Sequence, residues 1–205
     1  MPKIKLTKGE LKKQRDNLRQ YHRYLPTLQL KKQQLQIEMI RQSARIDEKR
    51  LSERAKKRDS QLWSALLSDP EVDIKPYLKP DAVLRSSRNI AGVDIPVFEK
   101  TEFRPAEYDL FLMPLWTDAA IENLRALVSL IEELKILEQG MLVLRQELRI
   151  TTQRVNLFEK VKIPEAEEAI RTIKIYIGDQ MANAVGRSKI AKKKIEEAVA
   201  REAVA

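Results

Sequence analysis

Two long heptad-repeat segments, separated by a stretch dense in proline, constrain the fold of this chain more than any other feature of its sequence. Six of the nine prolines lie between residues 70 and 114. No long helix persists there, because each proline removes a backbone hydrogen bond and clashes with the preceding turn. We therefore predict a coiled-coil helix over residues 1–69, a proline-rich insert over residues 70–116 and a second coiled-coil helix over residues 117–205.

The first helix carries a seam of mostly apolar residues that repeats every seven positions. The seam positions are Leu11, Gln14, Leu18, Tyr21, Leu25, Leu28, Lys32, Leu35, Met39, Gln42, Ile46 and Lys49. Pro26 falls inside this pattern, so we expect a kink or a short break near residues 24–26.

The second helix has the more regular seam. Its first part comprises Leu127, Leu130, Leu134, Leu137, Met141, Leu144, Leu148, Thr151, Val155 and Phe158. After Pro164 the seam resumes one residue out of step, at Ile170, Ile177, Ala184, Ala191 and Ala198. The shift predicts a local change of supercoil between residues 160 and 168. The late alanines predict a slender tip at which the two helices approach closely.

The insert has the character of a short β-hairpin. Residues 81–85 and 93–98 favour strands on either side of residues 89–92, which places Gly92 at or near the turn. A two-stranded ribbon is marginal alone, so it must lean on a helix or a partner. Trp63 and Trp116 flank the insert and either pack its root or anchor a partner surface.

The simplest fold for these segments is all-α: a long antiparallel two-helix coiled-coil hairpin, with the small β-hairpin in its insert and both termini at the opposite end. Of the formal net charge of +9, residues 3–23 contribute +6 and residues 187–205 contribute +3. If the two ends lie side by side, one tip of the molecule is strongly basic.

The sequence offers little for catalysis. It has no cysteine, and its five glycines form no phosphate-binding loop, so we expect no direct nucleotide binding. His22 is the only histidine and builds neither a catalytic triad nor a metal site. We expect a non-enzymatic, cytoplasmic protein without cofactor or metal, which meets a membrane only through partners, because no apolar run is long enough to cross a bilayer.

Three segments carry a family resemblance. Residues 153–164 (QRVNLFEKVKIP), residues 88–96 (RNIAGVDIP) and residues 30–39 (LKKQQLQIEM) occur in the order and at the spacing of one family. Together they resemble the central-stalk D subunit of V-type and archaeal A-type rotary ATPases. Residues 5–10 depart from the usual start of that family and look closer to its bacterial branch.

The resemblance implies a rotor shaft that couples ATP turnover in a catalytic head to rotation and to H⁺ or Na⁺ transport. The implied partners are the A and B subunits of the head, the small F subunit of the stalk and the funnel-shaped C/d subunit, with the F subunit expected at residues 40–65 and 120–150. The family signature falls on Arg154, Val155, Asn156 and Glu159. The candidates for bearing contacts with the head are Arg187, Lys189, Lys192, Lys193 and Lys194.

One alternative use of the basic tip stays open: binding phosphates of an anionic membrane or of nucleic acid. Nucleic acid is disfavoured, because aromatic side chains for base stacking are scarce there and acidic residues are interspersed among the basic ones.

Overall fold

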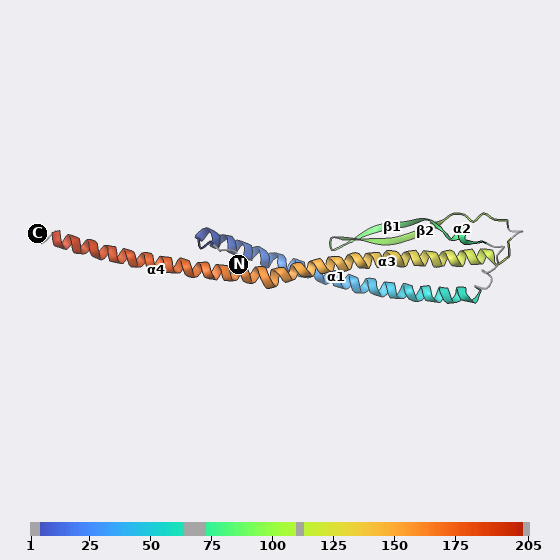
Figure 1. Cartoon of the computed structure of the whole chain (residues 1–205), viewed down its shortest axis with the longest axis horizontal. Helices are drawn as coiled ribbons and strands as arrows, with labels where there is room; N and C mark the ends of the chain where they lie inside the picture. The colour runs from blue at the N-terminus through green and yellow to red at the C-terminus, as the bar shows by residue number, and fades with distance from the viewer. Residues whose placement is uncertain (1–4, 64–72, 110–112, 203–205) are drawn as a thin grey trace. The chain divides into compact units, whose positions relative to one another are not determined.

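The computed structural model describes residues 5–63, 73–109 and 113–202 (Figure 1). In chain order, the elements are helix α1 (Lys8–Leu62), helix α2 (Lys75–Leu78), strands β1 (Pro80–Ile90) and β2 (Val93–Phe103), helix α3 (Thr117–Leu157), a π-helical turn η2 (Phe158–Lys162) and helix α4 (Ile163–Glu202). The predicted helical chain with one β-hairpin is confirmed. The predicted boundary between residues 69 and 70 lies outside the described residues.

The chain divides into two compact units. Residues 30–152 form one, here called the central unit, and residues 1–29 together with 153–205 form the other, here called the terminal unit. Each is described by itself.

In the central unit, α1 and α3 pair in antiparallel fashion. Gln42 Nε2 donates a hydrogen bond to the carbonyl oxygen of Leu137 at 3.3 Å, whereas Lys49, two turns further along α1, reaches back to Glu133 at 2.8 Å. The residue numbers along α3 decrease as those along α1 increase, so the two helices are antiparallel. Predicted seam positions are buried here, namely Leu35, Gln42, Ile46, Leu134, Leu144 and Thr151.

Strands β1 and β2 form the hairpin, and Ala91 and Gly92 form its turn. Both turn residues have positive φ, 52° and 76°, as a two-residue turn that matches the strand twist requires. The side-chain oxygen of Asn89 accepts a hydrogen bond from the backbone N–H of Gly92 at 3.0 Å. Each strand has eleven residues and is longer than predicted, because pairing continues through Pro96, opposite Ser87.

The hairpin covers the α1–α3 pair as a third layer and lies along α3 in Figure 1. Val93 and Ile95 of β2 pack with Leu35 of α1 and Leu144 of α3 in one buried cluster. The approach is close at Gly140, where a Cβ atom would lie 2.7 Å from Cγ2 of Ile95. A larger residue on α3 at this point would force Ile95 or the hairpin to move.

The terminal unit contains a second antiparallel helix pair. The rings of Tyr21 on α1 and Phe158 on η2 lie 5.4 Å apart between centroids. Beyond η2, the buried face of α4 comprises Ile163, Ala166, Ala169, Ile170 and Ile173. The turn η2 accounts for the predicted one-residue shift of the seam, since a π-helical turn accommodates one residue more than an α-helical turn.

The short break expected at residues 24–26 does not occur. Helix α1 continues through Pro26 from Lys8 to Leu62. Proline removes only one intrahelical donor, and the intact turns on both sides hold the helix together. The hydroxyl of Thr27 adds a local bond by donating to the carbonyl oxygen of Tyr24 at 2.8 Å.

The predicted slender tip made by both helices is also wrong. Residues 6–8 lie beside the stretch of α4 from Tyr176 to Ala184, and α4 continues to Glu202. Every residue from Gly178 to Val199 is exposed, including Ala184, Ala191 and Ala198. Within the described residues, α1 is too short to accompany α4 beyond this point, so the basic ends are staggered along the unit and do not meet in one tip.

Candidate partner-binding surfaces

The signature segment, which spans the end of α3 and the start of η2, divides into a buried side and an exposed side. Val155 is buried in the seam, and Phe158 is half-buried against Tyr21. Arg154, Asn156 and Glu159 are exposed. The apolar members therefore contribute to helix packing, and the polar members are accessible to a partner.

The five basic residues near the C-terminus all lie on the unaccompanied part of α4, and all are exposed. Lys192 and Lys193 form long ion pairs with Glu196 and Glu197, at 3.7 and 3.9 Å. Arg187 donates a hydrogen bond to the carbonyl oxygen of Asn183 at 3.4 Å, within its own helix. Such exposed pairs hold the side chains weakly, which leaves Arg187, Lys189 and Lys192 to Lys194 available for contact with another surface.

The root of the insert is a cluster around α2 and the start of α3. Ile74, Ala120 and Ile121 are buried there, and both Trp63 and Trp116 pack against them. Arg125 of α3 clamps the neighbouring chain segments: its guanidinium donates to the carbonyl oxygen of Tyr77 at 2.9 Å and to that of Arg104 at 2.6 Å. The sequence had not singled out Arg125, because nothing local marks an arginine that binds backbone carbonyls far along the chain.

Tyr108 adds a polar contact to this root. Its hydroxyl donates a hydrogen bond to a carboxylate oxygen of Asp118 in the first turn of α3. This hydrogen bond raises the pKa of the Tyr108 phenol above its ordinary value, because deprotonation would place two negative charges side by side.

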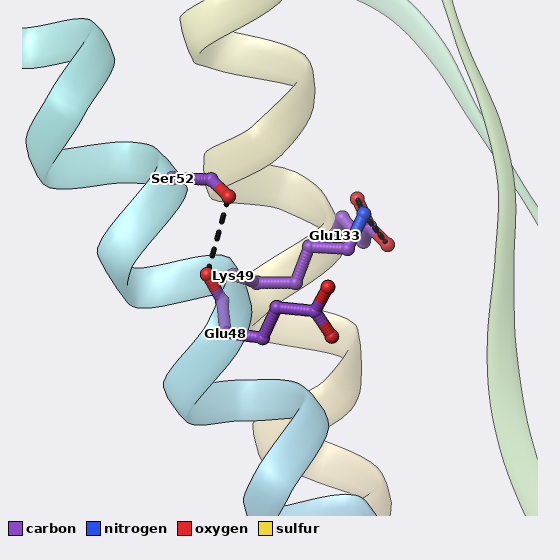
Figure 2. Close-up of polar contacts among 4 residues, drawn as sticks. All are labelled: Glu48, Lys49, Ser52 and Glu133. Carbon is purple, nitrogen blue, oxygen red and sulfur yellow. Dashed lines mark hydrogen bonds and ion pairs between the residues drawn. The ribbon is translucent and has the colours of Figure 1, made fainter.

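Two ion pairs join α1 to α3 in the central unit. Figure 2 shows the ammonium of Lys49 directed at the carboxylate of Glu133, beside the helical hydrogen bond from the Ser52 hydroxyl to the carbonyl oxygen of Glu48. Arg50 meets Glu138 at 2.7 Å, and this contact raises the pKa of the guanidinium. Both pairs cross between the helices, so they help to set the helix register.

Helix α1 also has an apolar stripe on its exposed side, here called the outer stripe. It comprises Leu30, Ile37, Ile40, Ala44 and Leu51. The four large residues are between 51% and 68% exposed, and Ile37 and Ile40 line a shallow groove with Gln33, Gln36 and Met39. Leu30, Ile37, Ala44 and Leu51 are seven residues apart, a signal that was present in the sequence but was masked by the stronger inner seam.

Comparison with known proteins identifies the chain. The family model for the ATP synthase D subunit matches residues 10–193. The V-type ATP synthase D subunit of Borreliella burgdorferi is 46% identical over 192 residues, which cover 94% of this chain and 95% of the relative. The chain belongs to the ATP synthase D-subunit family. The V-type ATP synthase D subunits of Chlamydia trachomatis and Chlamydia caviae are 32% and 33% identical, and each alignment covers 95% of this chain and at least 94% of the relative.

The D-subunit match extends over almost the whole chain. It takes in the signature at residues 154–159, the hairpin and the basic stretch as far as Lys193. The match therefore takes in parts of both units and α4 as far as residue 193.

His22 is exposed on α1. No cluster of three metal-ligating side chains occurs within residues 5–63, 73–109 and 113–202. In the same ranges, no helix is both long and apolar enough to span a membrane.

Proposed function

We propose that this chain is the central rotor shaft of a V-type rotary ATPase or ATP synthase. It couples ATP turnover in a catalytic head to rotation and to the transport of H⁺ or Na⁺. The observation that carries the proposal is the D-subunit match over 94% of the chain, at 46% identity to the Borreliella protein.

The physical basis of coupling is the asymmetry of a helix pair. A shaft of two helices has no threefold axis, so it presents a different face to each of three equivalent catalytic interfaces. Contacts that differ between interfaces give the sites different conformations, and turnover at the sites then favours rotation. Head and shaft are thus linked by a coupling free energy. The shaft itself performs no chemistry, in keeping with a chain that has no phosphate-binding loop.

The part of α4 that carries Arg187, Lys189 and Lys192 to Lys194 is the proposed bearing in the cavity formed by the A and B subunits of the head. Its exposure supports this assignment, because α4 beyond Ala184 is exposed on all sides as far as residue 199 and includes apolar residues that a partner surface would cover. The basic side chains are suited to acidic or carbonyl-rich walls.

The outer stripe of α1 is the proposed site for the small F subunit of the stalk. It overlaps residues 40–65, one of the two ranges in which we expect that partner from the family resemblance, and extends the site back to Leu30. The root of the insert, with Trp63 and Trp116, is the proposed contact for the funnel-shaped C/d subunit. In this arrangement the chain is cytoplasmic and peripheral to the membrane, which it meets only through partners.

Co-expression with the A, B and F subunits tests the proposal, with size-exclusion chromatography, mass measurement and an ATPase assay. We expect one copy of the chain to co-elute with a head of three A and three B subunits. Removal of residues 187–205, or replacement of the five basic residues by glutamine, is expected to lower ATPase activity. The matched control Lys12→Gln/Lys13→Gln changes two exposed lysines of α1 and leaves activity unchanged.

A chain that never joins the head would overturn the proposal. Salt-sensitive binding of the isolated chain to anionic liposomes or DNA would then support a role on phosphate surfaces. For the F subunit, the variant Ile37→Glu/Ile40→Glu is expected to abolish co-elution of that partner, whereas Leu84→Glu, at an exposed apolar residue of the hairpin, retains it. Retention of the F subunit by both variants would place its site elsewhere.

A further inference from the structure

Both helices of the terminal unit carry a defect in their backbone hydrogen bonding, close to one aromatic contact. On α1, Pro26 has no N–H to donate to the carbonyl oxygen of His22. On the opposite helix, η2 replaces the α-helical pattern, and the N–H of Ile163 donates to the carbonyl oxygen of Phe158, five residues back. Tyr21, next to His22, contacts the ring of Phe158.

The extra residue in η2 is not needed for seam packing. Val155 and Ile163 are eight residues apart, whereas Ile163, Ile170 and Ile177 follow at intervals of seven. Removal of one residue from η2 would restore an interval of seven throughout, and a regular α-helix would then keep the same residues on the seam. None of the five η2 residues is buried, so the loss of one sacrifices no core side chain.

A π-helical turn in a long helix is rare and is frequently found at functional sites. Both proline and π-turns are also recognised causes of helix bending. The surroundings of the two defects are open: no described residue of α1 in this unit is buried, in contrast to the buried face of α4 at Ile163, Ile170 and Ile173. Backbone hydrogen bonds with little apolar cover open more easily than those in a packed core.

We propose that η2 and the Pro26 turn together form a compliant joint, at which the helix pair bends and twists more readily than at residues 166–173 of the same unit. The Tyr21–Phe158 contact joins the two defects and keeps the helices paired there. The existence of the joint is inferred from the backbone geometry alone. Its role, to take up twist between catalytic steps, rests on the proposed rotor function.

Hydrogen exchange of the full-length chain tests the joint. Amides of residues 22–28 and 158–163 are expected to exchange roughly fivefold or more faster than those of residues 166–173, because each defect removes or weakens about one hydrogen bond. Deletion of Lys160, which is exposed, is expected to convert η2 to an α-helical turn and to slow exchange of residues 158–163, although Pro164 still has no N–H to donate. Lys160→Ala is the matched control, keeps the chain length and leaves the exchange fast.

Equal exchange in the joint and in residues 166–173 of the unaltered chain would overturn the proposal. Unchanged exchange in a folded Lys160 deletion variant would also overturn it. A deletion variant with reduced helix content would overturn it as well, because this loss would show that seam packing requires the extra residue. Pro26→Ala provides an independent arm: it restores the donor to His22 and is expected to slow exchange at residues 22–28 while η2 is unaltered. Fast exchange of residues 22–28 that persists in a folded Pro26→Ala chain would show that α1 does not contribute to the joint.

Single-molecule rotation of the assembled complex tests whether the joint takes up twist between catalytic steps. The angular fluctuation of a probe on the stalk during each catalytic pause is expected to narrow in the Lys160 deletion and to be unchanged in Lys160→Ala. Failure of the chain to assemble with the head would refute the rotor function but leave the exchange result standing. Unchanged fluctuation in an assembled, rotating complex would refute the role of the joint alone.

Discussion

The central unit and the terminal unit use the same heptad pattern with different results. In the central unit, a hairpin covers the helix pair, and clusters around Leu35 and Ile121 are buried. Among the described residues of the terminal unit, the buried ones lie on one face of the second helix between Val155 and Ile173, and residues 178–199 are all exposed. A two-helix seam alone buries only a narrow stripe, such as the one that contains Ile173, whereas a third layer encloses side chains on a wider face of the helix pair.

The difference fits the proposed division of work. A unit with three layers holds its shape and presents fixed surfaces to stalk partners. A unit with a sparse core and a bare helix is suited to fill a cavity that another protein provides. The predictions that follow test this contrast, from the largest expected effect to the smallest.

Truncation of fully buried seam residues measures the contrast directly. Leu144 in the central unit and Ile173 in the terminal unit are both 0% exposed. We expect Leu144→Ala to lower the free energy of unfolding by about 3–4 kcal/mol and Ile173→Ala by about 2 kcal/mol, because the sparser terminal unit collapses more easily around the cavity. Chemical denaturation followed by circular dichroism measures both, with Leu142→Ala, at an exposed position, as the control. Equal losses at the two sites would show that the terminal core is as tightly packed as the central one.

Replacement of a glycine by alanine is expected to change stability in opposite directions in the two units. Gly140→Ala places a Cβ atom 2.7 Å from Ile95 and is expected to destabilise the chain by about 1–3 kcal/mol, as the hairpin is forced away from α3. At Gly178 a new Cβ atom meets nothing within 4 Å, so Gly178→Ala is expected to stabilise α4 by about 1 kcal/mol through helix propensity. Thermal unfolding of both variants checks the signs. A stable Gly140→Ala chain would mean that the hairpin is loosely held.

The ion pair between Lys49 and Glu133 is expected to contribute modestly. Both side chains are partly exposed, at 37% and 22%, so solvent screens their attraction. A double-mutant cycle of Lys49→Ala and Glu133→Ala is expected to give a coupling energy of about 0.5–1 kcal/mol that falls with added salt. A coupling energy near zero would mean that apolar packing, and not this ion pair, sets the register of the two helices.

The smallest effect concerns pH. The hydrogen bond to Asp118 raises the pKa of Tyr108, so the folded chain holds this proton more tightly than the unfolded chain. Its contribution to stability is complete below the ordinary pKa of tyrosine and is lost as pH rises through the raised value. A titration of Tyr108 by NMR measures the shift, and Asp118→Asn is expected to reduce it. An unaltered pKa in Asp118→Asn would contradict the assigned cause.

Much of the fold follows from residues near one another in the sequence. The inner seam of α1 was predicted position by position, from Leu11 to Lys49, and none of its members is fully exposed. The turn at Gly92 was predicted because glycine tolerates the positive φ that a tight hairpin needs. The strands were predicted too short, since the polar residues of β1 between Arg85 and Asn89 do not show the alternation of a half-buried strand.

The candidate surfaces were predicted less completely. The exposed polar signature residues and the basic stretch on α4 were visible in the sequence, whereas the outer stripe of α1 and the Arg125 clamp were not. Whether another element covers a stripe of apolar residues can be seen only from the tertiary structure. The clamp depends on carbonyl groups 21 and 48 residues away in sequence.

The sequence by itself determined that the chain forms two long helices with a hairpin between them, because heptad spacing, proline density and turn residues act locally. Only the tertiary structure decided where the helices stop accompanying each other and which stripe the hairpin covers. It also decided how the chain absorbs the shifted seam, with a π-helical turn that begins at Phe158. These outcomes depend on contacts between residues far apart in the chain, and a local pattern does not specify its own partner.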